Sequence, residues 1–383
     1  MKVNKKMLIQ WYHIYFLALL GGTAAVLLLT PLAQKLAAVW DIMDRPKGEK
    51  HKFHGAATPL LGGAAMFSGW LLMLAAGLLS WHCSSGLEQA EIINRYLPGA
   101  QNNLFRIAII AAGAAAAVLL GTIDDIKGLK AHWKFLGQLL IALLAAGPGE
   151  MRISLFISAP WISYVITVFW FMMLMNAINF FDNMDGLAAG TAAIALILFT
   201  VAAGFQQQYF IATLSALGAG CALGFWFYNY TPASIFMGDG GSHFLGYLLA
   251  VASTGTTYFN PAIAASKVPV LIPLCILAVP IFDAMTVTVV RTLNGKPFWI
   301  GDHNHISHRF VRMGLSRKRA VQLVHILCLL TGLSSLPILW SSLATTIVIS
   351  VQMLLLLMLI TILQYAVIPH DLDSVVPPDK LKK

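Results

Sequence analysis

The sequence predicts an all-α integral membrane protein that crosses the bilayer about eleven times. Of its 383 residues, 58% are hydrophobic and 11% are charged, and its mean hydropathy is +0.76. A soluble domain carries about 25% charged residues, so this composition excludes a large soluble core. The net charge of +9 suits anionic lipid headgroups and anionic substrates. We expect the lipid bilayer as a partner and no nucleic acid.

Apolar segments of about 20 residues define the predicted spans. They are 12–33, 60–80, 104–123, 134–149, 153–176, 186–205, 209–228, 242–260, 268–290, 321–340 and 343–368. Residues 2–6 and the run after them resemble a signal peptide, but the run continues without a small-x-small cleavage site, so we expect a retained helix. We expect one domain, 1–383, with its motifs within about 12–320 and C-terminal helices and a tail at 321–383.

Lysine and arginine side chains set the predicted orientation, because they are enriched in cytoplasmic loops. With the loop after the first span in the cytoplasm, most of the 25 Lys and Arg residues fall in cytoplasmic loops or in the C-terminal tail. Lys2, Lys5 and Lys6 oppose this assignment. The N-terminus is then outside and the C-terminus inside, and every polar, motif-like loop faces the cytoplasm.

Acidic residues gather at the cytoplasmic ends of predicted spans. They are Asp41 with Asp44, Asp124 with Asp125, Asp182 with Asp185, Asp239, and Asp302. The chain has only 16 acidic residues, and carboxylates beside apolar segments are costly and usually functional. Asp124 and Asp125 repel each other, so at least one requires a cation or a raised pKa. The alternative is a solvated helix end that pairs with Lys127 or Lys130.

A second motif places Asn176, Asn179, Asp182 and Asp185 at every third position, just before Gly186. Neighbouring members of such a series share a face at a helix end. Amide and carboxylate oxygens suit Mg²⁺, which takes few protein ligands. The motif therefore indicates a metal or substrate site rather than four helix caps.

A glycine-rich turn surrounds Asp239, with Gly238 before it and Gly240 and Gly241 after it. Such a turn allows backbone N–H groups to approach a phosphate at the start of the following helix. The alternative is an ordinary turn that Ser242 caps.

Two further loops contain residues that could bind phosphate. In the first loop Lys52 and His54 could face a diphosphate, although lysines there could also be positive-inside anchors. In the last large loop His305, His308 and Arg309 favour phosphate over zinc, because no second soft-ligand cluster completes a zinc site. Asp283 lies inside a predicted span, eight residues before Arg291 and near the same helical face, so it could be a buried ion-pair partner rather than a ligand.

Together these motifs resemble the polyprenyl-phosphate N-acetylhexosamine-1-phosphate transferase family. The aspartate pair Asp124–Asp125, the Asn–Asp series at 176–186, the 229–242 segment and the first-loop residues Lys52, His54, Pro59, Gly62 and Gly63 occur in the family's order. The stretch 305–308 resembles the UDP-GlcNAc branch of the family, although Ser307 replaces the middle histidine of that branch's His-x-His-His pattern.

The resemblance implies a cytoplasmic-face enzyme of the bacterial cytoplasmic membrane. It would transfer GlcNAc-1-phosphate from UDP-GlcNAc to undecaprenyl phosphate, giving polyprenyl-diphosphate-GlcNAc and UMP. It also implies Mg²⁺, with Mn²⁺ as an alternative, and we assign Asp239 and Asn179 as its ligands. A homodimer is an expectation of the resemblance only.

The residue roles that follow are expectations of the same kind. Asp124 would orient or deprotonate the lipid phosphate, Asp125 would support it, and Asp182 would also be catalytic. Asp182, Asp185 and Asn229 would recognise uridine or ribose. The predicted substrate-binding residues are Lys52, His54, Lys134, Asn176, Asp185, Asn229, His305, His308 and Arg309.

Other readings of the sequence remain open at this point. A transporter or flippase would place ionisable groups near the bilayer midplane, whereas here nearly all lie at helix ends. A membrane scaffold would not need this set of carboxylates. Within the enzyme class, UDP-MurNAc-pentapeptide, UDP-GalNAc or another UDP-N-acetylhexosamine is an alternative donor.

Overall fold

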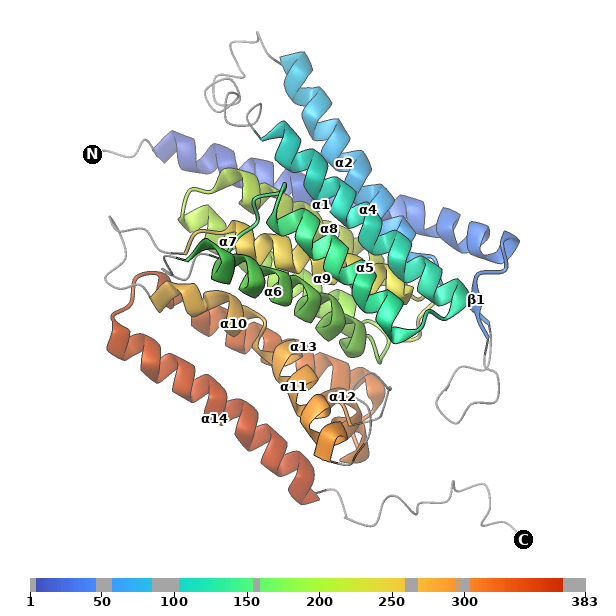
Figure 1. Cartoon of the computed structure of the whole chain (residues 1–383), viewed down its shortest axis with the longest axis vertical. Coiled ribbons are helices and arrows are strands. Elements are labelled where there is room, and N and C mark those ends of the chain that lie inside the picture. The colour runs from blue at the N-terminus through green and yellow to red at the C-terminus, as the bar shows by residue number, and fades with distance from the viewer. Residues whose placement is uncertain are drawn as a thin grey trace.

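The computed structural model describes residues 5–45, 57–84, 103–153, 159–258, 268–293, 295 and 304–367. Within these residues the fold is a bundle of long helices that lie side by side, with α14 along one edge (Figure 1). A two-residue antiparallel pair, β1 (Met43–Asp44) and β2 (Thr58–Pro59), is the only sheet in the described part of the chain. The prediction of an all-α fold is confirmed.

The helices follow one another along almost the whole described chain. They are α1 (Lys5–Val39), α2 (Gly62–Ser84), α4 (Leu104–Lys127), α5 (Ala131–Ala146), α6 (Pro160–Phe181), α7 (Leu187–Phe205), α8 (Tyr209–Asn229), α9 (Gly238–Gly255), η2 (Val268–Leu271), α10 (Ile272–Ile276), α11 (Ala278–Leu293), α12 (Ile306–Arg312), α13 (Arg317–Ser335), η3 (Leu336–Leu339) and α14 (Leu343–Val367).

Eight of the described helices are long and apolar enough to cross a membrane, and a bent pair would make a ninth span. That pair, Pro269–Ile276 with Ala278–Leu293, bends by 66°. The count of eleven is therefore not confirmed. Helix α5 has 16 residues, about 24 Å at 1.5 Å per residue, which is shorter than a bilayer core of about 30 Å. Helix α9, which lies in the predicted span 242–260, is not among the helices that are long and apolar enough to cross a membrane.

Helix α6, which lies in the segment predicted as the span 153–176, begins at Pro160. The proline occupies the first turn of the helix. A proline there loses no backbone hydrogen bond, because the first N–H groups of a helix have no partner within the helix.

Helix α9 forms the centre of the bundle. It contacts α2, α4, α6, α7 and α8, and every residue from Gly240 to Thr254 is buried. Gly121 of α4 lies so close that an added Cβ atom would overlap the carbonyl group of Asp239. This close approach brings the carboxyl end of α4, with Asp124 and Asp125, against the start of α9.

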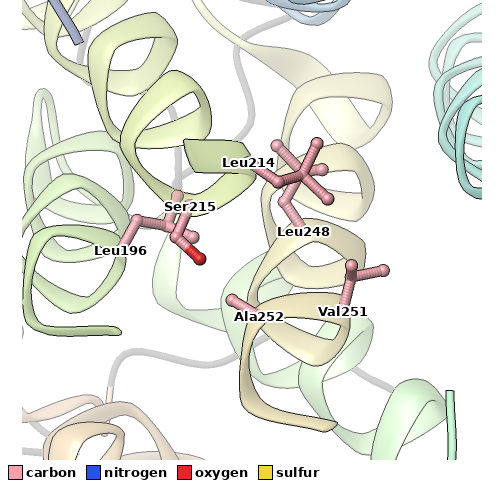
Figure 2. A pocket seen from close by; sticks show the side chains of 6 residues that line it. All are labelled: Leu196, Leu214, Ser215, Leu248, Val251 and Ala252. Atoms are coloured by element: carbon pink, nitrogen blue, oxygen red, sulfur yellow. The ribbon is translucent and has the colours of Figure 1, made fainter. Parts of the chain in front are cut away.

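A small gap between α7, α8 and α9 lies deep among the helices (Figure 2). Five of its lining side chains are apolar, and Ser215 is the only polar one. Such a lining offers no charge for a phosphate and a single hydroxyl group for a sugar. The charged residues lie instead at the helix ends.

Candidate active site

Lys134 is the residue on which the candidate site converges. Its Nζ atom lies 2.9 Å from Asp124 Oδ2, 2.5 Å from Asp239 Oδ2 and 3.3 Å from Asn179 Oδ1. Asn179 Nδ2 also donates to Asp239 Oδ1 at 2.7 Å. Side chains from α4, α6 and α9 thus surround the ammonium group of a lysine on α5, although the four residues are far apart in the sequence.

Asp124 lies where α4 ends. Its Oδ1 atom accepts a hydrogen bond of 2.7 Å from the Leu129 N–H group, and its Oδ2 atom faces Lys134. Gly128 takes the left-handed conformation that lets the chain leave α4 at this point. The turn between α4 and α5 is therefore folded around the Asp124 carboxylate, which fixes one oxygen and directs the other into the site.

Asp125 has a different set of contacts from Asp124. Its two oxygens accept hydrogen bonds from the backbone N–H groups of Asp239, at 2.9 Å, and Gly240, at 3.3 Å. These are unpaired donors of the first turn of α9, so a carboxylate from α4 caps that helix and faces the positive end of its dipole. The sequence predicted that Asp125 would support Asp124 in catalysis, and this capping contact was not foreseen.

The charges of the site shift the pKa values of two carboxyl groups in opposite directions. Burial alone would raise the pKa of Asp239, but the Lys134 charge and hydrogen bonds lower it to about 2. Burial and the negative charges of Asp239, Asp125 and Asp185 raise the pKa of Asp182 to about 8. At neutral pH and without a further cation, Asp239 is ionised and Asp182 is largely protonated.

Asp185 and Asn229, from the predicted motifs at 176–186 and 229–242, bind backbone groups. Asp185 Oδ2 accepts from the Ala233 N–H group at 3.0 Å. The buried Asn229 accepts from the Gly186 N–H group at 3.0 Å and donates to the Ile235 carbonyl at 2.9 Å. Asp185 and Asn229 therefore hold the α6–α7 and α8–α9 connections together, and their predicted contacts with substrate stay predictions.

Asn176 belongs to a polar group beneath the Lys134 centre. It donates to Gln138 Oε1 at 2.7 Å, and Gln138 Nε2 lies 2.8 Å from His243 Nε2. Sequence reasoning missed Gln138 and His243. The signal was present, because each lies four residues after a predicted site residue, Lys134 and Asp239 respectively, and so on the same helix face.

The histidine segment forms a second, buried cluster on α11 and α12. Asp283 accepts hydrogen bonds from His305 Nδ1, at 2.7 Å, and from the Ile306 N–H group, at 2.6 Å. Arg309, which is fully buried, lies 3.8 Å from the same carboxylate. Asp283 is thus buried and ion-paired, as predicted, but the sequence did not suggest its partners His305 and Arg309. These contacts join α11 to the segment 305–309.

This cluster is linked directly to the Asp182 segment. Ser307, the residue that replaces the middle histidine, is buried and donates to Asn183 Oδ1 at 2.6 Å. The guanidinium of Arg291 lies over the ring of Phe180, 5.3 Å from its centroid. The predicted residues of the last loop are therefore held next to the α6–α7 connection.

The predicted residues Lys52, His54 and Asp302 lie outside the described residues. The described residues that follow the first loop pack close to the site. Pro59 accepts from the Phe236 N–H group at 2.8 Å, and Gly63 donates to the Met237 carbonyl at 3.0 Å. The start of α2 is thus tied to the segment that leads into Asp239.

Fold and site define a helical membrane protein with carboxylates and a lysine gathered at one end of its bundle. The family model described as glycosyl transferase family 4 matches residues 107–257, which include the Lys134 centre. A probable undecaprenyl-phosphate N-acetylglucosaminyl 1-phosphate transferase of Bacillus subtilis (strain 168) is 33% identical over 328 residues, or 83% of each chain. The chain therefore belongs to glycosyl transferase family 4.

Other relatives carry two different kinds of name. A decaprenyl-phosphate N-acetylglucosaminephosphotransferase of Mycobacterium leprae (strain TN) is 32% identical, over 81% of this chain and 80% of the relative. A phospho-N-acetylmuramoyl-pentapeptide-transferase of Rubrobacter xylanophilus is 30% identical, over 72% of this chain and 82% of the relative.

Proposed function

We propose that this protein transfers GlcNAc-1-phosphate from UDP-GlcNAc to undecaprenyl phosphate, giving polyprenyl-diphosphate-GlcNAc and UMP. The observation that carries the proposal is the convergence of Asp124, Asn179 and Asp239 on the Lys134 ammonium group. Two anionic substrates can react only where cations offset their repulsion. The names of the relatives supply the polyprenyl phosphate and the GlcNAc group, and the UDP donor is part of the proposal.

The oxygen atoms around Lys134 also fit a divalent cation. They already surround one cationic atom, and carboxylate and amide oxygens are the ligands that Mg²⁺ prefers. The described residues contain no group of three or more His, Cys, Asp or Glu residues that could hold a metal, so water and substrate phosphate would supply most of the Mg²⁺ ligands. Asp239 and Asn179 would hold Mg²⁺ here, or Mn²⁺ in its place. When bound, Mg²⁺ would offset the charge of the donor diphosphate and stabilise the leaving UMP.

The side chains of the site position the two phosphates for direct displacement. An oxygen of the lipid phosphate attacks the phosphorus atom that bears the sugar, and the bond from that phosphorus to the UMP oxygen breaks, so UMP leaves with the electron pair. Asp124 orients the lipid phosphate and accepts a proton where one remains. Because the second pKa of a phosphate monoester is about 6, orientation contributes more than proton removal.

Lys134 would bind phosphate oxygens once its present partners are shared with the cation and the substrates. The buried His305–Arg309 cluster would offer further donors to the diphosphate. Asp182 and Asp185, beside the α6–α7 connection, would face the nucleotide. The reaction would take place at the cytoplasmic face of a bacterial membrane, with the N-terminus outside and the C-terminus inside.

The test is UMP release by the purified full-length protein in detergent with undecaprenyl phosphate, UDP-GlcNAc and Mg²⁺, and with each omitted in turn. Release that requires all three would support the proposal. The Asp239→Ala variant is expected to lose Mg²⁺-dependent turnover, and full activity of this variant would contradict the metal assignment. Silence with every UDP-sugar, in folded protein, would overturn the reaction and favour a transporter or a scaffold.

A second candidate donor is UDP-MurNAc-pentapeptide. The observation that favours it is the relative of Rubrobacter xylanophilus, whose name states the transfer of phospho-N-acetylmuramoyl-pentapeptide. A panel with UDP-GlcNAc, UDP-GalNAc and UDP-MurNAc-pentapeptide separates the donors, and release with UDP-MurNAc-pentapeptide alone would keep the mechanism and change the substrate.

A further inference from the structure

Three helices contribute polar side chains to the site in pairs, one helical turn apart. Helix α5 contributes Lys134 and Gln138, and α9 contributes Asp239 and His243. Helix α6 contributes the pair Asn176 and Asn179. Residues three or four positions apart lie on the same face of a helix. The pairs therefore form two layers, with Lys134, Asn179 and Asp239 in the charged upper layer and Gln138, Asn176 and His243 in the neutral lower layer.

The lower layer is a closed hydrogen-bonded group. Gln138 and Asn176 exchange hydrogen bonds through their amides, at 2.7 Å and 3.2 Å. Gln138 Nε2 also lies 2.8 Å from His243 Nε2, and His243 Nδ1 lies 2.6 Å from the Asp239 carbonyl oxygen. Gln138 and His243 are both 0% exposed. Burying an unpaired polar group costs free energy, so these hydrogen bonds favour the one alignment of the three helices in which every group is paired.

The contacts of His243 determine where its proton lies. The Asp239 carbonyl can only accept, so Nδ1 carries the hydrogen and donates it. Nε2 is then an acceptor and requires a donor, which the Gln138 amide supplies. If the Gln138 amide were turned over, its Oε1 atom would face His243 Nε2, and both atoms are acceptors. The arrangement is therefore self-consistent and uses a neutral imidazole.

The lower layer is hydrogen-bonded to the backbone of Asp239, whose carboxylate belongs to the upper layer. The Asp239 carbonyl also accepts from Ser242 Oγ at 3.2 Å, while the Asp239 N–H group donates to Asp125. The backbone of Asp239 is thus held on both sides, and the direction of its carboxylate toward Lys134 and Asn179 is fixed.

We propose that Gln138 and His243 are positioning residues that set the direction of the Asp239 carboxylate and thereby the affinity of the site for a divalent cation. The inference rests on the proposed function for the identity of the reaction, but not for the geometry. Neither residue reaches the reacting atoms in this arrangement, because both lie a turn deeper than the Lys134 centre.

The test measures Mn²⁺ binding to the full-length protein in detergent by electron paramagnetic resonance, without any substrate. Gln138→Met keeps the length of the side chain and removes its donor, and His243→Leu removes both of the histidine contacts. Each is expected to weaken Mn²⁺ binding by about 10-fold or more, the range seen for groups that orient metal ligands. His243→Asn, which can restore the donor to the Asp239 carbonyl, is expected to recover part of the affinity.

The matched control is Leu248→Ala on the same helix, where the residue is 3% exposed and lines the apolar gap between α7, α8 and α9. It is expected to lower thermal stability through a cavity while leaving Mn²⁺ affinity unchanged. The double variant Gln138→Met with His243→Leu is expected to lose less affinity than the product of the single losses, because the two act in one network. In the UMP-release assay, Gln138→Met and His243→Leu should have a lower kcat than the wild type and an unchanged KM for UDP-GlcNAc.

The inference is overturned if Gln138→Met and His243→Leu lose stability as Leu248→Ala does but keep wild-type Mn²⁺ affinity. A wild-type protein that binds no Mn²⁺ would also overturn it. A wild-type protein that binds Mn²⁺ but releases no UMP with any donor would refute the proposed reaction alone, because the Mn²⁺ measurements would still decide the role of the lower layer.

Discussion

At the scale of single residues, Lys134 occupies the position that we propose for a divalent cation. Its ammonium group is 2.5 Å from Asp239 Oδ2 and 3.3 Å from Asn179 Oδ1, so it contacts both of the proposed metal ligands. In Lys134→Met we expect Mn²⁺ to bind more tightly in the absence of substrate, because the tethered cation no longer competes. UMP release should nevertheless fall, because a phosphate-binding charge is lost. Electron paramagnetic resonance and the UMP assay check both, and weaker Mn²⁺ binding would contradict the expectation.

Asp182 gives a prediction of pH dependence. Its pKa in the folded protein, about 8, is above the ordinary value of 3.8 because of burial and three neighbouring carboxylates. The folded state therefore binds this proton more tightly than the unfolded state, and stability falls as the pH rises between these two values. We expect Asp182→Asn, measured by thermal unfolding with a chelator present, to be more stable than the wild type above pH 8. The difference should disappear in acid, and a constant difference at all pH values would contradict the assignment.

At the scale of elements, the start of α9 depends on a cap from another helix. Asp125 accepts from the first N–H groups of α9, at 2.9 Å and 3.3 Å. Removing such a cap costs about 1 kcal/mol. Asp125→Ala should therefore lower the unfolding midpoint and also weaken Mn²⁺ binding, because Asp239 is in the capped turn. Asp125→Asn, which keeps an acceptor oxygen, should lose less, and equal losses in the two variants would argue against capping.

The elements also show how far sequence reasoning reaches. The carboxylates could be predicted because charged residues at the ends of apolar segments are conspicuous in the sequence. Their association could be predicted because those ends all lie on the same predicted side of the membrane. Gln138 and His243 were missed because they lie inside apolar runs, where a single polar residue gives no periodic signal. Helix α9 was predicted as an ordinary span, yet it is buried on all sides and begins with glycines and Asp239. Only the packing of its neighbours reveals that it is the centre of the fold.

At the scale of the whole molecule, the bundle has two unlike ends. The Lys134 centre joins the carboxyl end of α4 and the start of α9. The turn between α7 and α8 pairs instead with the end of α9, because Gln208 exchanges hydrogen bonds of 2.9 Å and 2.8 Å with Thr257. One helix therefore separates the site from the α7–α8 turn. In the proposed orientation the site is cytoplasmic and the α7–α8 turn is external.

This orientation can be tested with single cysteines at the two ends. Gln207 and Lys130 are both exposed, the first in the α7–α8 turn and the second between α4 and α5. In a background with Cys83 replaced by serine, the other three cysteines are buried. A membrane-impermeant thiol reagent should label Gln207→Cys on intact cells and should label Lys130→Cys only after permeabilisation. The reverse pattern would place the site outside, where no nucleotide pool exists to supply a UDP-sugar, and would refute the proposed reaction together with the orientation.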